Sequence, residues 1–339
     1  MKHDWLLVEV LGDLPTVVAQ GDRLRRFVPS EVFLRRNPHR RQIDQAIAAA
    51  VDGKAGIVQR TAHGNWLICA DPVTMSDGRV HGVHVWTGPS ATEPPDRPEV
   101  GATVWDLSSG LASDTRQALV NSGIDPTQPL DHRALADDLV VGSIHPEEGA
   151  ALAAAVRWEA GQTLWGTWDI DDYLGNPIRV NFVSRATADR HSKGDIRHCI
   201  RAMNWRSPRA ADHSSGFALA EQILRGTGRE GSHRALLSLD SWTLLKWLDL
   251  PCPHFDWRGE HSSQPLVHPD DRPVRVAMTQ QFVHGPAEGL LRLRSRSGWT
   301  LIHTTVSRVE LAKDVVAGLI SFRLPLPHDI TADEGSGRV

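Results

Sequence analysis

The chain has 339 residues, of which 40% are hydrophobic and 23% charged, and a formal net charge of −4. This composition is typical of a globular protein and excludes a disordered chain, and the charge gives no overall attraction to nucleic acid or to an anionic membrane. At roughly 150 residues per domain, the length predicts two or three domains.

The cysteines and the hydropathy indicate the compartment. Cys69, Cys199 and Cys252 are odd in number and widely spaced, which fits neither a disulfide framework nor a zinc site. The N-terminal apolar run is interrupted at Glu9, too early for a signal peptide, and no run of about 18 apolar residues could span a bilayer. We therefore expect a cytoplasmic protein without a transmembrane segment.

Two stretches divide the chain. Residues 89–100 contain four prolines, and residues 206–233 are rich in Ser, Gly and Arg around the amphipathic run 217–224; proline-rich stretches of this kind are typical of linkers. We expect a first domain over 1–90, a linker over 91–100, a central domain over 101–206, a linker with a short helix over 207–233, a third domain over 234–325 and a flexible tail over 326–339.

The first domain begins with a basic run. Its arginines are Arg23, Arg25, Arg26, Arg35, Arg36, Arg40 and Arg41. Because apolar residues such as Phe27 and Leu34 interleave with them, we interpret the run as the solvated face of a helix. Contact with a partner or a lipid headgroup, and contact with nucleic acid, are the alternatives.

A helix and three strands are expected in the rest of this domain. Ile43, Ile47 and Val51 recur at four-residue spacing after Asn37–His39, which predicts a helix. Strands are predicted over 56–60, 66–73 and 80–86, with Asp77-Gly78 as the turn of a hairpin.

The central and third domains repeat one pattern. In each, a His-Pro-acid-acid motif (145–148 and 268–271) precedes a helical stretch, to about Trp158 and about Phe282. Strand-like runs follow over 163–170, 178–187 and 196–205, and again over 289–294, 299–309 and 315–324. The turn glycines Gly175 and Gly298 both lie 30 residues after the motif histidine, so the copies are offset by 123 residues at two landmarks. This agreement indicates a duplication, and each unit predicts an α+β domain with an antiparallel sheet and short helices on one face.

The motif histidines, His145 and His268, are candidates for an acid–base or metal-binding role, but a helix start explains the pattern better. A residue before proline is extended, proline suits the first helical position, and carboxylates in the first turn are stabilised by the helix dipole.

Other polar groups form no recognisable chemical site. His81 and His84 lie three residues apart on one strand, so we expect them on opposite faces. Asp169, Asp171 and Asp172 lack the spacing of a calcium loop and indicate a solvated hairpin tip, and Asp137-Asp138 and Asp270-Asp271 are further carboxylate pairs. Nucleophile elbow, zinc, P-loop and dinucleotide motifs are not found. We therefore assign no catalytic or metal-binding residue and leave any cofactor site and cofactor unidentified.

The tryptophans fall mainly in predicted strands: Trp66, Trp86, Trp168, Trp205 and Trp299. We expect them to pack in cores or at domain interfaces, with a ligand wall as the alternative. The segment 239–248, which includes Trp242 and Trp247, is apolar enough to cover a neighbouring domain.

These residues carry a family resemblance. Residues 267–324, with the His268-Pro269-Asp270-Asp271 helix start, the Ser297-Gly298-Trp299 hairpin and the final strand 316–320, resemble a bacterial PAS domain. The central segment, with Trp105–Gly110, His145–Glu148 and Trp168–Ile170, is similar to a PAS or a GAF domain, and the choice between them stays open. The whole chain resembles the mycobacterial triple sensor-domain proteins of PAS–GAF–PAS arrangement.

The resemblance implies three tandem PAS/GAF-like domains, each with a five-stranded antiparallel sheet whose concave face holds a small molecule or a partner. The flavin-binding cysteine motif, a haem-binding histidine and the cyclic-nucleotide GAF signature are not found, so no ligand is implied.

A sensor is the function that we expect. The third unit reaches about Leu324, which leaves 15 residues and no space for an output domain. We expect a non-enzymatic actinobacterial signalling protein that couples binding of a small ligand or a protein partner to the arrangement of its domains. The alternative is a scaffold that docks other proteins through its PAS-like surfaces. A structure without a cavity above roughly 300 Å³ would argue against sensing.

Overall fold

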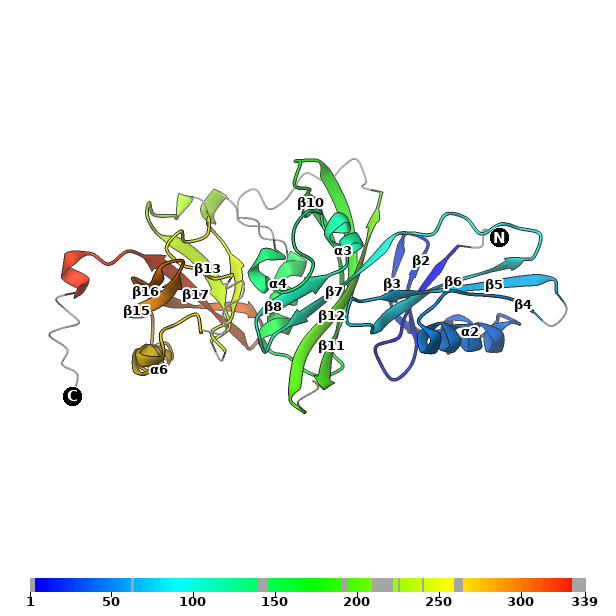
Figure 1. The fold of residues 1–339 in the computed structure, drawn as a ribbon, viewed down its shortest axis with the longest axis horizontal. Coiled ribbons are helices and arrows are strands. Elements are labelled where there is room, and N and C mark those ends of the chain that lie inside the picture. Colours follow the sequence, from blue (N-terminus) through cyan, green and yellow to red (C-terminus); the bar gives the residue numbers. More distant parts are fainter. Residues whose placement is uncertain are drawn as a thin grey trace. The chain divides into compact units, whose positions relative to one another are not determined.

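The computed structural model describes residues 4–61, 64–139, 146–190, 194–208, 222–224, 226–239, 241–258 and 265–330. Within them the chain forms three antiparallel sheets in chain order, with few helices (Figure 1). This arrangement fits the predicted α+β class.

The first sheet has the strand order β3-β2-β1-β6-β5-β4. Its strands are β1 (Leu6–Glu9), β2 (Thr16–Gln20), β3 (Arg23–Pro29), β4 (Ile57–Arg60), β5 (Trp66–Thr74) and β6 (Val80–Pro89). Helix α1 (Ser30–Phe33) is a single turn, and α2 (Arg40–Gly53) packs on β5 and β6 (Figure 1). The predicted four-residue spacing is confirmed, because Ile43 and Ile47 of α2 are buried in the core and Val51 is partly buried against it.

The second sheet has the order β10-β11-β12-β7-β8-β9. Its strands are β7 (Val100–Asp106), β8 (Leu111–Asp114), β9 (Arg133–Ala134), β10 (Thr163–Asp171), β11 (Pro177–Arg190) and β12 (Ile196–Ser207). The helices of this segment are α3 (Arg116–Asn121), the 3₁₀ turn η1 (Leu135–Asp137) and α4 (Pro146–Val156). Thr115 caps α3 by accepting a hydrogen bond from the backbone N–H of Ala118.

The third sheet has the order β14-β13-β17-β16-β15. Its strands are β13 (His233–Leu237), β14 (Leu244–Trp247), β15 (Ala287–Ser295), β16 (Gly298–Ala312) and β17 (Val315–Arg323). The 3₁₀ turn η2 (Pro269–Asp271) leads into α6 (Arg272–Gln281), which packs on β15.

All three sheets share one topology. The first strand of each lies beside its last strand, in the pairs β1–β6, β7–β12 and β13–β17. The other N-terminal strands extend the sheet on one side, and the C-terminal three-strand meander extends it on the other. The third sheet has one N-terminal strand fewer. Common topology is what a duplication produces.

The predicted meanders are confirmed to within three residues at each strand end in all three domains. The N-terminal strands were not predicted from the sequence. β1 is buried at every position and β2 at all but its last, so neither shows the alternation that marks a half-buried strand.

The contacts between residues divide the chain into two compact units, and the boundaries of these units differ from those of the three sheets. One unit comprises Met1–Trp105, Ser113–Asp131 and Glu159–Asp212, and the other comprises Asp106–Ala112, His132–Trp158 and His213–Val339. The second unit contains α4, which packs against β16 and β17 of the third domain. We expected each helix on the sheet of its own domain, so the placement of α4 corrects that expectation.

The segment 239–248 also differs from expectation. Its residues 244–247 form β14, a strand of the third domain's own sheet, and they also contact η1 of the central domain. Trp247 is fully buried against Phe255, Trp257 and Phe322.

The expected linker and the expected tail both lie partly within the described residues. Residues 217–221 lie outside the described residues, and 222–224 are helical. In the tail, residues 327–330 are helical, and Asp329 accepts a hydrogen bond of 2.6 Å from Nη1 of Arg323. The expected flexible tail is therefore folded through Ile330.

Candidate functional site

The first domain contains a cavity of about 440 Å³ beside α2. Its wall comes from the β1–β2 loop (residues 10–15), from the start of α1 and from one side of α2. Arg40, Asp44, Ile47 and Val51 line it from α2, and their three- and four-residue spacing places them on one helix face. The volume lies within the range of about 300–1,000 Å³ that is usual for small-molecule sites.

Carboxylates predominate in the lining. The charged residues are Asp13, Glu31, Asp44, Asp52 and Arg40. Nε of Arg40 lies 3.7 Å from Oδ2 of Asp44, one helical turn away. The carboxylates of Asp13, Glu31 and Asp52 have no ion-pair partner in the described part of the chain. The cavity therefore carries an excess of three formal negative charges.

The crowding of these charges affects Asp44. Burial raises the pKa of its carboxyl group, the Arg40 guanidinium opposes this, and the Glu31 carboxylate raises it further. The resulting pKa lies above the ordinary value of 3.8, because the single guanidinium does not offset burial and like charge together.

A polar group and an apolar wall complete the cavity. Ser30, the first residue of α1, lines it and is 6% exposed. Its hydroxyl has no hydrogen-bond partner among the described residues, so it is available to whatever occupies the cavity. Val10, Pro15, Ile47 and Val51 supply hydrocarbon surface.

The cavity loop is bound to the central domain through Glu9. This carboxylate, 2% exposed, accepts hydrogen bonds from the backbone of Leu11 (3.1 Å) and from Oγ1 of Thr16 (3.0 Å). Nε of Arg185, on β11, donates to Oε1 of Glu9 at 2.7 Å. A methyl group on Gly12 would lie 2.7 Å from the guanidinium carbon of Arg185, so this arginine lies directly against the loop.

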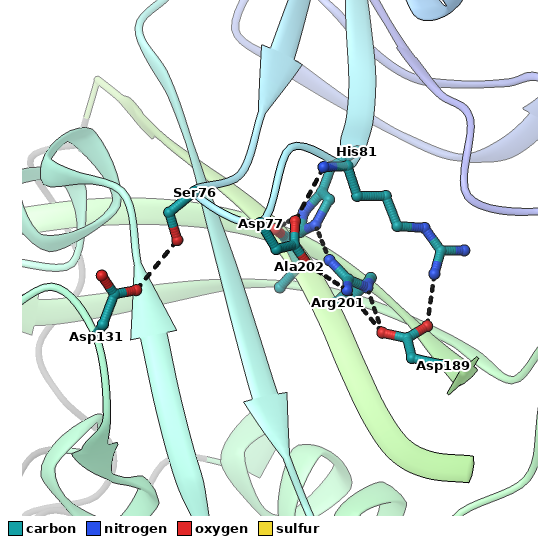
Figure 2. Close-up of polar contacts among 8 residues, drawn as sticks. Ser76, Asp77, His81, Asp131, Asp189, Arg201 and Ala202 are labelled. Atoms are coloured by element: carbon teal, nitrogen blue, oxygen red, sulfur yellow. Dashed lines mark hydrogen bonds and ion pairs between the residues drawn. The ribbon is translucent and has the colours of Figure 1, made fainter. Parts of the chain in front are cut away.

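A second connection between these domains is a buried polar cluster around Arg201 of β12 (Figure 2). Its side chain is 6% exposed and donates hydrogen bonds to Oδ2 of Asp77 (2.5 Å) and to Oδ2 of Asp189 (2.8 Å). Burial alone would raise the pKa of Asp77 and of Asp189, but the hydrogen bonds and charge of Arg201 outweigh it and hold both below the ordinary value. Ser76 and Asp131 meet at the edge of the same region, at 3.1 Å.

His81 belongs to this cluster. Its Nε2 lies 3.0 Å from Nη1 of Arg201, and its Nδ1 lies 3.0 Å from the carbonyl oxygen of Ala202. Since a guanidinium only donates, Nε2 accepts and Nδ1 carries the proton. Burial, with the Arg201 charge, lowers the pKa of His81 to about 4, although the bond to Ala202 opposes this. The imidazole is therefore neutral near pH 7.

His84, like His81, lies on the side of β6 that faces residues of the central domain. It stacks edge-on against Trp5, at 6.1 Å between ring centroids, and lies in one small crevice with Val100 and Trp205. The prediction that His81 and His84 lie on opposite faces is wrong, because a register shift between Val73 and Thr74 breaks the alternation near the start of β6. Burial, aided by the charge of Arg97, lowers the pKa of His84 to about 3.

The interior of the third domain differs from the first. A void between Trp242, Phe255, Leu291 and Phe322 measures only about 20 Å³. That is far below the range of about 300–1,000 Å³ that is usual for small-molecule sites. Aromatic side chains pack beside this void, where the ring centroids of Phe255 and Phe322 are 5.4 Å apart.

The predicted basic helix face is wrong for part of its length. Arg23, Arg25 and Arg26 lie on the strand β3, and the guanidinium of Arg26 lies 5.9 Å from the ring of Trp165. Of the run, only Arg40 and Arg41 lie within a helix. A strand forms because residues 23–29 pair with β2.

The helix-start motifs are partly described. His145 lies outside the described residues, and α4 begins at Pro146. In the third domain Nδ1 of His268 accepts a hydrogen bond of 3.2 Å from the backbone N–H of Asp270. Asp271 does more than stabilise a helix end, because its carboxylate accepts hydrogen bonds from the backbone N–H (2.7 Å) and the guanidinium of Arg292 on β15.

The remaining candidates occupy structural positions. Asp172 accepts backbone hydrogen bonds from Leu174 and Asn176, which confirms the predicted hairpin tip for this residue. Asp169 and Asp171 lie within β10, and Asp169 pairs with Arg179 at 2.7 Å. Asp137 pairs with Arg258 and Asp138 with Arg133. All three cysteines are buried and free.

The described ranges contain no group of three or more His, Cys, Asp or Glu side chains that could hold a metal ion. No helix among them combines the length and apolar character needed to cross a bilayer.

Sequence reasoning did not find the cavity acids. Ile47, Val51 and Arg40 were singled out, but as core or basic residues. The available signal was the charge on the same helix face, where Asp44 and Asp52 are two turns apart. Asp13 and Glu31 come from other elements, and only the fold brings them near α2.

Comparison with known proteins covers nearly the whole chain. Three family models match: Rv3651-like, N-terminal (residues 4–96), Rv3651-like, middle domain (99–207), and Rv3651-like, C-terminal domain (217–333). The crystal structure of an uncharacterized protein from Mycobacterium tuberculosis is 42% identical, with a TM-score of 0.88 over 98% of this chain and 99% of that one.

Two further structures are much less similar. An Escherichia coli DhaR(N)–DhaL complex matches at 12% identity and a TM-score of 0.21, over 62% of this chain and 80% of that one. An RNA-binding light-oxygen-voltage receptor matches at 10% and 0.25, over 70% and 99%. Scores this low carry no argument about this chain. No curated protein matches the sequence.

Proposed function

We propose that this chain, which belongs to the Rv3651-like family of three-domain proteins, is a sensor that binds a small molecule in its first domain. The observation that carries the proposal is the cavity of about 440 Å³ together with the bond from its loop to Arg185. Its volume exceeds the roughly 300 Å³ below which the structure would argue against a sensor function.

Binding would be transmitted by direct contact. A molecule in the cavity contacts the loop 10–15, and Glu9 and Gly12 connect that loop to Arg185 on β11. If the loop has two arrangements, a ligand that prefers one of them shifts the population of both the loop and β11. The protein would then signal through a partner protein in the cytoplasm, without enzymatic chemistry of its own.

The finer domain identities belong to the same proposal. We assign the first and third domains to the PAS type and the central one to the PAS or GAF type. The five-stranded antiparallel third sheet and the shared topology of all three sheets support this assignment.

Native mass spectrometry of the gently purified full-length chain, from the cells that make it, tests ligand binding. An added stoichiometric mass that disappears on denaturation is expected. A clean apoprotein mass from several growth conditions would contradict the proposal.

Hydrogen exchange tests the coupling. The expected result is that removal of the bound molecule changes amide exchange in β11 (177–190) as well as in the loop 10–15. In an Arg185→Met variant the loop should still respond while β11 does not. An Arg179→Met variant, on the same strand but remote from Glu9, is the matched control.

A scaffold function is the second candidate, and the third domain favours it. The described void between its aromatic side chains measures only about 20 Å³, which is too small for a ligand and favours docking of other proteins there. If native mass spectrometry finds no bound small molecule, while a partner protein co-purifies with the chain whose third-domain surface is intact, a scaffold is the better description.

A further inference from the structure

The acidic lining narrows the chemistry of the first-domain cavity. Four carboxylates and one guanidinium line it beside an apolar wall, and of the acids Asp13, Glu31 and Asp52 are exposed. An anionic ligand would add to the existing repulsion, whereas a cation would relieve it. An uncharged apolar ligand would make no use of these charges.

A metal ion does not fit this arrangement. The carboxylates come from the β1–β2 loop, from α1 and from two turns of α2. No three of them converge on one point, since the described residues hold no group of three potential metal ligands. Charges spread around a wall match a molecule that carries its positive charge along a chain.

A third feature points to an organic ligand. Ser30, a residue 94% buried, lines the cavity, and its hydroxyl has no hydrogen-bond partner among the described residues. This hydroxyl can accept from an ammonium group. Val10, Pro15, Ile47 and Val51 offer hydrocarbon contacts between the charged groups. An alkyl chain that ends in ammonium groups would use both kinds of surface.

We propose that the first-domain cavity binds a small organic cation of the alkylamine or polyamine class, with its ammonium groups on Asp44, Asp52 and Glu31 and its chain against Ile47 and Val51. This inference rests on the proposed sensor function and specifies the ligand class of that site.

Isothermal titration of the full-length chain tests the ligand class, with spermidine and putrescine as the probes. Succinate serves as the anionic control and MgCl₂ as the inorganic one. At about 0.15 M salt, where the screening length is about 8 Å, saturable binding of one spermidine is expected, with putrescine weaker. Saturation by succinate, equal binding of Mg²⁺, or no amine binding would overturn the proposal.

Substitutions locate the site. The double variant Asp44→Asn, Asp52→Asn should bind spermidine about tenfold more weakly or worse, since it removes two of the opposing charges. Ser30→Ala should weaken binding by a smaller factor. The matched control replaces exposed acids away from the cavity, Glu93→Gln with Asp96→Asn, and should bind as the wild type does. An equal loss of spermidine affinity in both double variants would show that only the net charge of the protein matters, and would contradict binding at this cavity.

Failure of this inference is distinguishable from failure of the sensor function. If native mass spectrometry finds a bound molecule that is not a cation, and spermidine does not bind, the ligand class is wrong and the sensor remains. If spermidine binds and the acid variants abolish it, but exchange in β11 is unchanged, the ligand class holds and the coupling is wrong.

Discussion

At the scale of single residues, several buried charges lie between the first two domains, and those named here have defined partners. Arg201 bridges Asp77, Asp189 and His81, and Arg185 holds Glu9. Buried ions require such partners because removal from water costs several kcal/mol per ion. These residues therefore control how firmly the two sheets are joined.

Arg201→Met should destabilise the protein. The change leaves Asp189, whose side chain is 14% exposed, without its main partner, while Asp77, at 43%, is better solvated. We expect the free energy of unfolding to fall by about 3 kcal/mol, at the lower end of the range for breaking a buried pair. Urea denaturation at pH 7 measures it.

The control for Arg201 is Arg97→Met, because Arg97 and Asp71 form a more exposed pair at 3.2 Å. Its cost should stay below about 1 kcal/mol. Equal losses in the two variants would show that the Arg201 cluster contributes no more than a surface pair.

The buried histidines make stability depend on pH. Burial, with the Arg97 charge, lowers the pKa of His84 to about 3, against about 6.5 when unfolded. Between these values the unfolded chain binds more protons, so stability is lost as the pH falls below 6.5. From pH 7 to pH 5 the loss due to His84 should be about 2 kcal/mol.

His84→Phe tests this dependence. Phenylalanine keeps a ring against Trp5 and removes Nδ1, which has no hydrogen-bond partner within the described residues. Denaturant titrations at pH 7 and pH 5 should show a smaller loss than in the wild type, by about 2 kcal/mol. His254→Phe, at an exposed position, should leave the difference unchanged. An unaltered pH profile in His84→Phe would contradict the buried neutral state.

At the scale of elements, close backbone approaches determine which helices can pack where. Gly101 of β7 lies under α3, and a methyl group there would be 2.2 Å from the backbone nitrogen of Ala118. Backbone atoms cannot move aside as a side chain can, so β7 and α3 require glycine at this position.

Gly101→Ala should therefore lower the free energy of unfolding by about 3 kcal/mol, as overpacking does. Gly53→Ala, in the last turn of α2 with no atom within 4 Å, should instead raise it by about 0.5–1 kcal/mol. Thermal denaturation of both variants measures the contrast. Similar midpoints for the two would show that α3 can shift away from β7.

The same elements explain what the sequence could predict. The meanders of the last two domains were predictable because each hairpin has a turn glycine, Gly175 or Gly298, between β-branched and aromatic runs. Strand β1 was not predictable, because its buried run has no alternation of polar and apolar residues. Strand β3 was not predictable either, because its arginines indicated a solvated helix. The cavity acids belong to three elements, and only tertiary contacts bring them together.

At the scale of the whole molecule, sequence domains and packing units differ. The central domain contributes α4 and η1 to the unit that contains the third domain, where α4 packs on β16 and β17 and η1 contacts β14. Residues 151–155 of α4, four alanines and Leu152, are all buried. A family boundary near residue 207 thus separates segments that share a core.

This sharing predicts how a fragment behaves. A chain that ends at residue 208 keeps α4 and η1 but loses β13–β17, and with them the groups that bury Ala134, Ala136 and the α4 alanines. It also loses Lys246, which is 1% exposed and donates to Oε1 of Glu148 on α4. A short helix without its packing surface is unstable in water, so α4 should lose its protection in the fragment.

Hydrogen exchange followed by mass spectrometry measures this loss. Amides of 146–156 should exchange at least about tenfold faster in the fragment than in the full chain, which corresponds to about 1.4 kcal/mol of lost local stability. Amides of β11 and β12, whose partners Glu9, Asp77 and His81 remain, should exchange as before. Equal protection of α4 in both proteins would show that the central domain holds this helix by itself, and faster exchange throughout would show that the first unit depends on the third domain for its stability.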